Sequence, residues 1–190
     1  MGNREALLVS AKACLREKGY DRTSVRDIAT AAGVSTAAVG YHYGSREALL
    51  NQALFEILDE WGDAMGRVLV PDADGSTRAH FERVWEGLIE DFGAHPDLWL
   101  ASVELFMQAQ RQSGLRPALA GGIAQGRRGM AAILDGVREE EVAETSVRTL
   151  GTVQLALMSG LMFQCLGDPS SAPTASEVLA GIQALAEVAR

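Results

Sequence analysis

The chain has 190 residues, of which 47% are hydrophobic and 22% are charged, with a net charge of −8 at pH 7. This composition excludes a disordered chain and fits one compact domain, or a small domain joined to a larger one. No continuous apolar run approaches the roughly 20 residues that span a bilayer, and the opening MGNREALLVS lacks the apolar stretch of a signal peptide. We therefore expect a cytoplasmic protein with no membrane partner.

The apolar spacing predicts helices throughout the chain and no strand. The first predicted helix covers residues 4–18, with Asn3 as its N-cap and Gly19 as its stop. Two short helices over 24–32 and 35–43 follow. Side-chain caps are expected from Ser24 (with Asp27 as its capping-box partner), from Ser35 and from Ser45, after which a longer helix runs towards Val68.

The rest of the chain is predicted to be a series of longer helices. Residues 70–76, VPDADGS, are predicted to form a loop, and residues 167–173, GDPSSAP, to form a linker. The predicted helices of this part cover residues 77–93, 97–113, 116–136, 140–166 and 175–189.

Charge is distributed unevenly along the chain. Residues 1–50 carry seven Lys or Arg and five Asp or Glu, whereas residues 51–190 carry ten and twenty. A mildly basic segment ahead of a strongly acidic remainder indicates that only the N-terminal segment faces a polyanion such as nucleic acid.

The stretch SVRDIATAAGVSTAAVGYHY, residues 24–43, has the pattern of a helix-turn-helix. Gly33 allows the left-handed backbone of a tight turn, and Val34 follows it as an apolar plug. The 100° step of a helix places Val39 on the packing side of the second helix. The opposite face then comprises Thr36, Ala37, Gly40 and Tyr41. In this motif the second helix lies in the major groove of DNA, although spacing alone leaves plain helix packing equally open.

The longer stretch from Gly19 to Leu50 resembles the N-terminal domain of TetR-type (tetracycline-repressor-like) transcriptional regulators. The matching residues are Tyr20, Thr23-Ser24, Ile28-Ala29, Gly33-Val34-Ser35, Tyr41-His42-Tyr43 and Ser45-Arg46-Glu47-Ala48-Leu49-Leu50. The resemblance implies an all-α fold with a three-helix DNA-binding domain, residues 1–46, and a larger helical domain for effector binding and dimerisation, residues 47–190. It also implies a repressor that binds a palindromic operator as a homodimer and is released by a small, largely apolar effector.

The resemblance further implies roles for single residues. Phosphate contacts are implied for Thr23, Tyr41, His42 and Arg46, with Arg26 as a further candidate. Base contacts are implied for Ser35, Thr36, Ala37 and Tyr41. Gly40 stands where the family commonly has a larger side chain, so we expect the helix backbone to approach DNA closely there. A half-exposed helix-end histidine and a solvated first-turn arginine are the alternatives for His42 and Arg46, and Tyr43 is expected in the core.

In the C-terminal part, the last two predicted helices are expected to form the dimer interface. Residues 140–166 are apolar on nearly all sides towards their end, and residues 175–189 carry an apolar stripe, so both helices need to be covered. A monomeric helical core is the alternative. An effector pocket is expected among large, adaptable side chains, although plain core packing explains each of them as well. These are Trp61, Met65, Trp85, Trp99, Phe106, Gln108, Met130 and Met162.

An enzyme, or a helical small-molecule-binding protein without a DNA function, is the main alternative to a regulator. The sequence lacks the Glu-x-x-His, Gly-x-Ser-x-Gly and His-Glu-x-x-His patterns of the common helical and hydrolytic enzymes. The Asp91–His95 pair is expected to be a surface pair, and Cys14 and Cys165 to be reduced thiols. We expect no catalysis, no cofactor and no metal.

Overall fold

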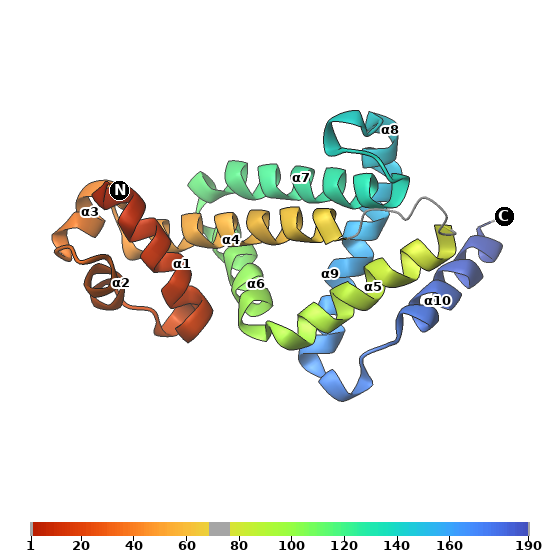
Figure 1. Cartoon of the computed structure of the whole chain (residues 1–190), viewed down its shortest axis with the longest axis horizontal. Helices are drawn as coiled ribbons and strands as arrows, with labels where there is room; N and C mark the ends of the chain where they lie inside the picture. Colours follow the sequence, from red (N-terminus) through yellow and green to blue (C-terminus); the bar gives the residue numbers. More distant parts are fainter. Residues whose placement is uncertain (1, 69–76, 190) are drawn as a thin grey trace. The chain divides into compact units, whose positions relative to one another are not determined.

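The computed structural model describes residues 2–68 and 77–189, and the side chains of residues 65–68 and 77 lie outside this description. The described residues are helical and form no strand, which confirms the all-α prediction (Figure 1). The predicted loop over 70–76 lies outside the described residues. The α-helices are α1 (Asn3–Arg22), α2 (Val25–Ala32), α3 (Ala37–Tyr43), α4 (Arg46–Val68), α5 (Thr77–Ala94), α6 (Pro96–Arg111), α7 (Arg116–Asp135), α8 (Glu144–Ser146), α9 (Thr152–Gly167) and α10 (Ala175–Val188).

The chain forms two compact units. One contains the residues up to Trp61 together with Asp97–Leu119, and the other contains Gly62–Pro96 and the residues from Ala120 onwards. The two units are defined by which residues pack together. The predicted boundary between residues 46 and 47 instead separates a DNA-binding part from an effector-binding part, and it stays a prediction.

The first unit is built around one apolar core to which α1, α2, α3, α4 and α6 all contribute. The three N-terminal helices lie together (Figure 1). The core contains at least one residue from each of the five helices that is at most 2% exposed. These include Leu7 of α1, Ile28 of α2, Val39 of α3, Leu50 of α4 and Leu105 of α6. Helix α6 therefore contributes to the same core as the helix-turn-helix, although it lies far from it in sequence.

The helix starts in this unit follow the predicted caps in part. Ser24 and Asp27 form the predicted capping box, and the Ser45 hydroxyl accepts a hydrogen bond from the Ala48 N–H at 3.0 Å. The predicted Asn3 cap is wrong, because Gly2 is the N-cap and its carbonyl accepts the first helical hydrogen bond. The predicted Ser35 cap is also wrong. Helix α3 begins at Ala37, and its N-cap residue Thr36 makes no side-chain cap.

In the second unit, α5 packs against both α9 and α10. The predicted single helix over 140–166 is wrong at its start, because a 3-10 turn (Glu139–Glu141), α8 and a π-helical segment (Val147–Gly151) precede α9. Gly151 is buried against α7, where any Cβ would overlap the carbonyl oxygen of Arg127. The close approach of these two backbones accounts for a glycine at the end of the π-helical segment.

The helical run Glu144–Gly167 has 24 residues, and an 18-residue stretch within it has a mean hydropathy of 1.4, so by length and composition alone it could cross a membrane. The run is not a continuous apolar stretch, because it contains Glu144, Arg148, Gln154 and Gln164. The same properties suit a helix that is covered by protein, and α9 does pack against α5. Of that 18-residue stretch, 28% is buried within the described part of the chain.

Candidate nucleic-acid interface

The turn between α2 and α3 has the geometry that the sequence predicted. Gly33 adopts the left-handed conformation (φ 67°, ψ 28°), and its N–H donates to the carbonyl of Thr30 at 3.1 Å. The N–H of Val34 donates to the carbonyl of Ala29 at 3.0 Å, and the Val34 side chain packs against the core. These bonds end α2 in an ordered way and fix the direction in which the chain enters α3.

Helix α3 is anchored by one side and exposed on the other. Val39 is 2% exposed in the core, and Ala38 and Tyr43 are partly buried against it. The Tyr43 hydroxyl also donates to the carbonyl of Arg4 at 2.6 Å, as suits the core position predicted for it. The exposed side consists of Ser35, Thr36, Ala37, Gly40 and Tyr41. Tyr41 is 85% exposed, and the space above Gly40 is open.

His42 is half-buried and lies edge-on against its neighbour Tyr41, with ring centroids 4.9 Å apart and an interplanar angle of 83°. The helical step directs it away from the side that carries Thr36 and Ala37. The contact of His42 with DNA stays a prediction.

Thr23 holds the joint between α1 and α2. Its side chain is fully buried, and its hydroxyl is 2.7 Å from the carbonyl of Gly19 and 3.2 Å from that of Cys14. Gly19 has a φ of 75°, which ends the regular part of α1. A phosphate contact from the Thr23 side chain would require its hydroxyl to leave both carbonyls, so the geometry gives this residue a structural role.

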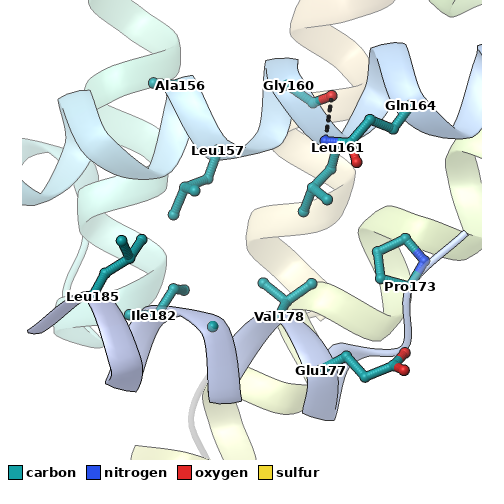
Figure 2. Close-up of a pocket in the computed structure, with 11 residues that line it drawn as sticks. Ala156, Leu157, Gly160, Leu161, Gln164, Pro173, Glu177, Val178, Ile182 and Leu185 are labelled. Atoms are coloured by element: carbon teal, nitrogen blue, oxygen red, sulfur yellow. Dashed lines mark hydrogen bonds between the residues drawn. The ribbon is translucent and has the colours of Figure 1, made fainter.

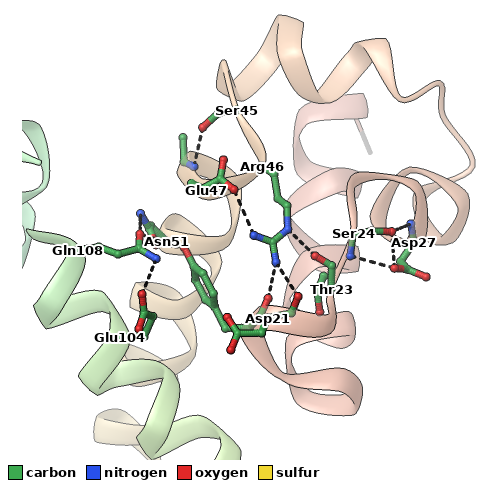
Figure 3. Close-up of polar contacts among 12 residues, drawn as sticks. Asp21, Thr23, Ser24, Asp27, Ser45, Arg46, Glu47, Asn51, Glu104 and Gln108 are labelled. Atoms are coloured by element: carbon green, nitrogen blue, oxygen red, sulfur yellow. Dashed lines mark hydrogen bonds and ion pairs between the residues drawn. The ribbon is translucent and has the colours of Figure 1, made fainter. Parts of the chain in front are cut away.

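Arg46 fastens the start of α4 to the same joint (Figure 3). Its guanidinium donates to the carbonyls of Thr23, Tyr20 and Asp21, and lies over the Tyr20 ring at 5.5 Å from the centroid. The Arg46 side chain is 22% exposed and also pairs with Glu47 at 3.2 Å. In this conformation the guanidinium is occupied by the protein, and its contact with phosphate stays a prediction.

Replacing Arg46 by alanine is expected to lower the free energy of unfolding of the first unit by about 2 kcal/mol, because carbonyls that a charged donor now satisfies lose their partner. Arg46→Lys is expected to recover less than half of this, since an ammonium cannot span three carbonyls in the plane of a guanidinium. Urea unfolding followed by circular dichroism measures both effects. Equal stability of Arg46→Ala and wild type would contradict the anchoring role.

Most cations of the basic segment are already paired. Lys12 Nζ lies 2.6 Å from Glu60 and 3.0 Å from Glu56, and the hydrogen bonds that Lys12 donates to these carboxylates raise its pKa. Arg16 also pairs with Glu60 at 2.8 Å, and Lys18 pairs with Asp27 at 2.7 Å. Among the described side chains of residues 2–64, the exposed Lys and Arg that form no ion pair with a carboxylate are Arg4, Arg22 and Arg26. The segment therefore offers far fewer positive charges to a polyanion than its sequence indicates.

Asp27 is expected to titrate far below its ordinary pKa of 3.8, because Lys18 and the hydroxyl and N–H of Ser24 all hydrogen-bond its carboxylate. A folded-state pKa below the unfolded value stabilises the fold above pH 3.8, and this contribution is lost as the pH falls through the folded-state pKa. An NMR titration of the Asp27 side-chain carboxyl measures this folded-state pKa. The pKa should rise in Lys18→Met, and a wild-type midpoint near 3.8 would contradict the geometry.

The residues predicted to bind an effector are divided between the two units. In the first unit, Trp61 and Trp99 meet edge-to-face with centroids 4.9 Å apart, whereas Phe106 is 48% exposed. In the second unit, Trp85, Met130 and Met162 are buried, and the side chain of Met65 lies outside the described residues. Their binding role stays a prediction.

Gln108, another predicted effector residue, has a different setting in the structure (Figure 3). The buried Tyr20 hydroxyl donates to Asn51 Oδ1 at 2.6 Å and to Gln108 Oε1 at 3.2 Å. The Asn51 amide also donates to Gln108 at 3.3 Å, and the Gln108 amide donates to Glu104 at 3.3 Å. Gln108 thus ties α6 to α1 and α4, which is a structural role that spacing along one helix did not indicate.

Two further features of the structure were missed by the sequence interpretation. The first is an apolar groove of about 450 Å³ between α9 and α10, in which Leu157 and Leu161 face Val178 and Ile182 (Figure 2). The second is a set of buried polar atoms without a hydrogen-bond partner in the described structure. They are Trp61 Nε1, His80 Nδ1, Trp85 Nε1 and Gln154 Oε1.

Comparison with known proteins matches both parts of the chain. Residues 7–53 match the model of bacterial regulatory proteins of the tetR family, and residues 76–188 match the model of a tetracyclin repressor-like C-terminal domain. The chain belongs to the TetR family. The match confirms the resemblance of the helix-turn-helix segment, and the family is one of regulators and not of enzymes.

Single relatives of this TetR-family chain are more distant. The regulator BetI 2 of Chromohalobacter salexigens is 31% identical over 84 residues, which are 44% of this chain and 41% of the relative. The repressor KstR2 of Rhodococcus jostii is 37% identical over 59 residues, which are 31% of this chain and 29% of the relative. A solved regulator from Saccharomonospora viridis in complex with choline has a TM-score of 0.63 at 21% identity, covering 97% of this chain and 95% of its own. The chain thus spans less than half the length of these two curated relatives, and the solved structure shows a shared fold.

Proposed function

We propose that this chain is a cytoplasmic transcriptional repressor that binds a palindromic DNA operator as a homodimer and leaves it when a small effector binds. Residues 1–46 bind DNA in this proposal, and residues 47–190 bind the effector and the second copy. The observation that carries it is the geometry of α3, which is anchored by Val39 and exposes Thr36, Ala37 and Tyr41 on the opposite side. Anchoring on one side leaves the other side of α3 available to a major groove.

A mobility-shift assay with the DNA that flanks the chain's own gene tests this function. We expect retardation of one fragment that unlabelled specific DNA competes away and scrambled DNA does not. The absence of sequence-selective retardation at any salt concentration would refute the proposal and favour a helical binding protein without a DNA function.

Operator affinity is expected to fall steeply as the salt concentration rises. The three cations of residues 2–64 that form no ion pair in each protomer (Arg4, Arg22 and Arg26) give a dimer about six phosphate contacts, hence a slope of about −5 in log affinity against log salt. Fluorescence anisotropy over a salt series measures this slope. Arg26→Gln is expected to reduce its magnitude by about 2 in the dimer, whereas Lys18→Gln leaves it unchanged because Lys18 is held by Asp27. Equal slopes for the two variants would contradict this assignment.

The dimer is proposed to form through α9 and α10. The groove between these helices is lined by apolar side chains, and α9 exposes Val153 and Phe163 at 56% and 57%, while α10 exposes Leu185 at 65%. Apolar surface of this kind, on two neighbouring helices, is typical of a helix-bundle interface between copies. Light scattering measures the mass, and a monomer that still binds operator tightly would contradict this part of the proposal.

The proposed effector is a small, largely apolar molecule with a few polar groups. The C-terminal family match supports a binding domain, and the choline complex of the Saccharomonospora viridis protein is a precedent for a small ligand on this fold. The unpartnered Trp85 Nε1 and Gln154 Oε1 in the second unit offer a buried donor and acceptor. A thermal-shift screen tests it: a compound that raises the Tm should also release operator DNA, and stabilisation without release would refute effector control.

A further inference from the structure

Helix α3 and its flanking turns carry an unusual set of side chains for a DNA-contacting segment. Between Gly33 and Gly44 the sequence contains no Arg, Lys, Asn, Gln, Asp or Glu. The exposed side of this segment presents the hydroxyls of Ser35, Thr36 and Tyr41 and the methyl groups of Thr36 and Ala37. The open space above Gly40 lets another molecule come close to the backbone beside them.

The chemistry of base pairs limits what such a surface can recognise. In the major groove, the bidentate contacts that discriminate guanine come from Arg or Lys and those for adenine from Asn or Gln, cytosine is recognised by Asp or Glu, and the hydroxyls of Ser and Thr contact bases without such discrimination. The C5 methyl group of thymine is recognised by apolar contact with Ala or with the Thr methyl group. Thymine is therefore the base whose distinguishing group matches the side chains that Thr36 and Ala37 present.

Neighbouring side chains do not supply the missing base readers. Arg46 is bound to three backbone carbonyls, and Lys18 is paired with Asp27 at 2.7 Å. Arg26 is exposed but belongs to α2, the helix that crosses the phosphate backbone in this motif. His42 is held against Tyr41 and lies away from the side of Ala37.

We propose that α3 recognises its operator through thymine methyl groups that pack against Thr36 and Ala37. The base pairs beneath α3 are then A·T pairs, and no guanine is required there. This inference rests on the proposed function, in which α3 lies in the major groove, and it adds the chemical class of DNA that the surface selects.

The test starts from duplexes that the full-length protein selects out of a random-sequence library. In the selected operator, single thymines are replaced by uracil, which lacks only the C5 methyl group. We expect each uracil beneath α3 to lower the affinity about fourfold, the value of one buried methyl group. Replacing the same T·A pair by 5-methylcytosine·guanine should retain more affinity than replacing it by cytosine·guanine, because the methyl group is kept. Duplexes in which guanines are replaced by 7-deazaguanine should bind the protein with unchanged affinity.

Protein variants assign the methyl contact to a residue. Ala37→Gly should reduce the uracil effect to less than twofold at one thymine of each half-site, as measured by a double-mutant cycle. Ala48→Gly removes the same methyl group from an exposed position on α4 and should leave every uracil effect unchanged. Folding of both variants is checked by circular dichroism.

The outcomes separate this inference from the proposed function. Selective binding that is insensitive to uracil, or that falls more than tenfold with 7-deazaguanine beneath α3, overturns the methyl recognition while the regulator function stands. Loss of the 7-deazaguanine effect in Arg26→Gln would then identify Arg26 as the base reader in its place. A library that yields no selected duplex overturns the regulator function and the inference together.

Discussion

Replacing Gly151 by alanine is expected to lower the free energy of unfolding of the second unit by about 3 kcal/mol. Gly151 is buried at the end of the π-helical segment, and a Cβ at this position would overlap the carbonyl oxygen of Arg127 on α7. A backbone carbonyl cannot rotate away as a side chain can, so the two helices would have to separate. Separation would loosen the neighbouring contacts of Ala131, which lies in the small core formed with Val142 and Val147.

The matched control is Gly121→Ala on α7, where a Cβ has no heavy atom within 4 Å. There alanine is expected to raise the free energy of unfolding by a few tenths to about 1 kcal/mol, because it restricts the unfolded chain more than glycine does. Urea unfolding followed by circular dichroism measures both variants. Similar stability changes in the two would contradict the close approach of α7 to the π-helical segment.

Replacing Gly40 by leucine is expected to reduce operator affinity about 100-fold, which corresponds to about 2.7 kcal/mol. Gly40 lies on the exposed side of α3, opposite the buried Val39, and the space above it is open in the free protein. A leucine side chain fits there without DNA, so the fold and the dimer should be retained. In the complex, the same side chain would hold the α3 backbone away from the base pairs.

Gly121→Leu is the matched control for Gly40→Leu, since both sites are exposed helical glycines with no heavy atom within 4 Å of a Cβ. It should bind operator as wild type does. Fluorescence anisotropy gives the affinities, and light scattering and thermal unfolding confirm that both variants are intact. Wild-type affinity in Gly40→Leu would mean that Gly40 faces away from DNA and that the proposed recognition side of α3 is wrong.

The local features of the helix-turn-helix followed directly from the sequence. The Ser24–Asp27 capping box, the left-handed Gly33 and the buried Val39 depend on residues no more than a few positions apart, so spacing and propensity were sufficient to predict them. The close approach of Gly151, at the end of the π-helical segment, to the backbone of Arg127 joins residues that are distant in sequence. Periodicity along one helix carries no information about such a contact.

The roles of single polar residues depend on hydrogen-bond partners that cannot be identified from the sequence. Arg46 fits a phosphate contact by family pattern, yet its guanidinium binds carbonyls more than 20 residues away. Gln108 fits an effector pocket by its place on α6, yet it bonds to Tyr20 and Asn51. In both cases the hydrogen-bond partner of the side chain is a backbone carbonyl or a buried hydroxyl that lies far away in sequence. Only the tertiary structure shows that the two groups are close together.

Site-specific photocrosslinking to the operator tests whether the exposed side of α3 contacts DNA. A photoreactive residue is placed at position 41, in place of the 85% exposed Tyr41, or at position 9 on α1, in place of the 48% exposed Val9. We expect crosslinks from position 41 to two half-sites about 10 base pairs apart, and none from position 9. Selective operator binding with crosslinks from position 9 and none from position 41 would contradict this expectation, because DNA would then meet α1 and not α3.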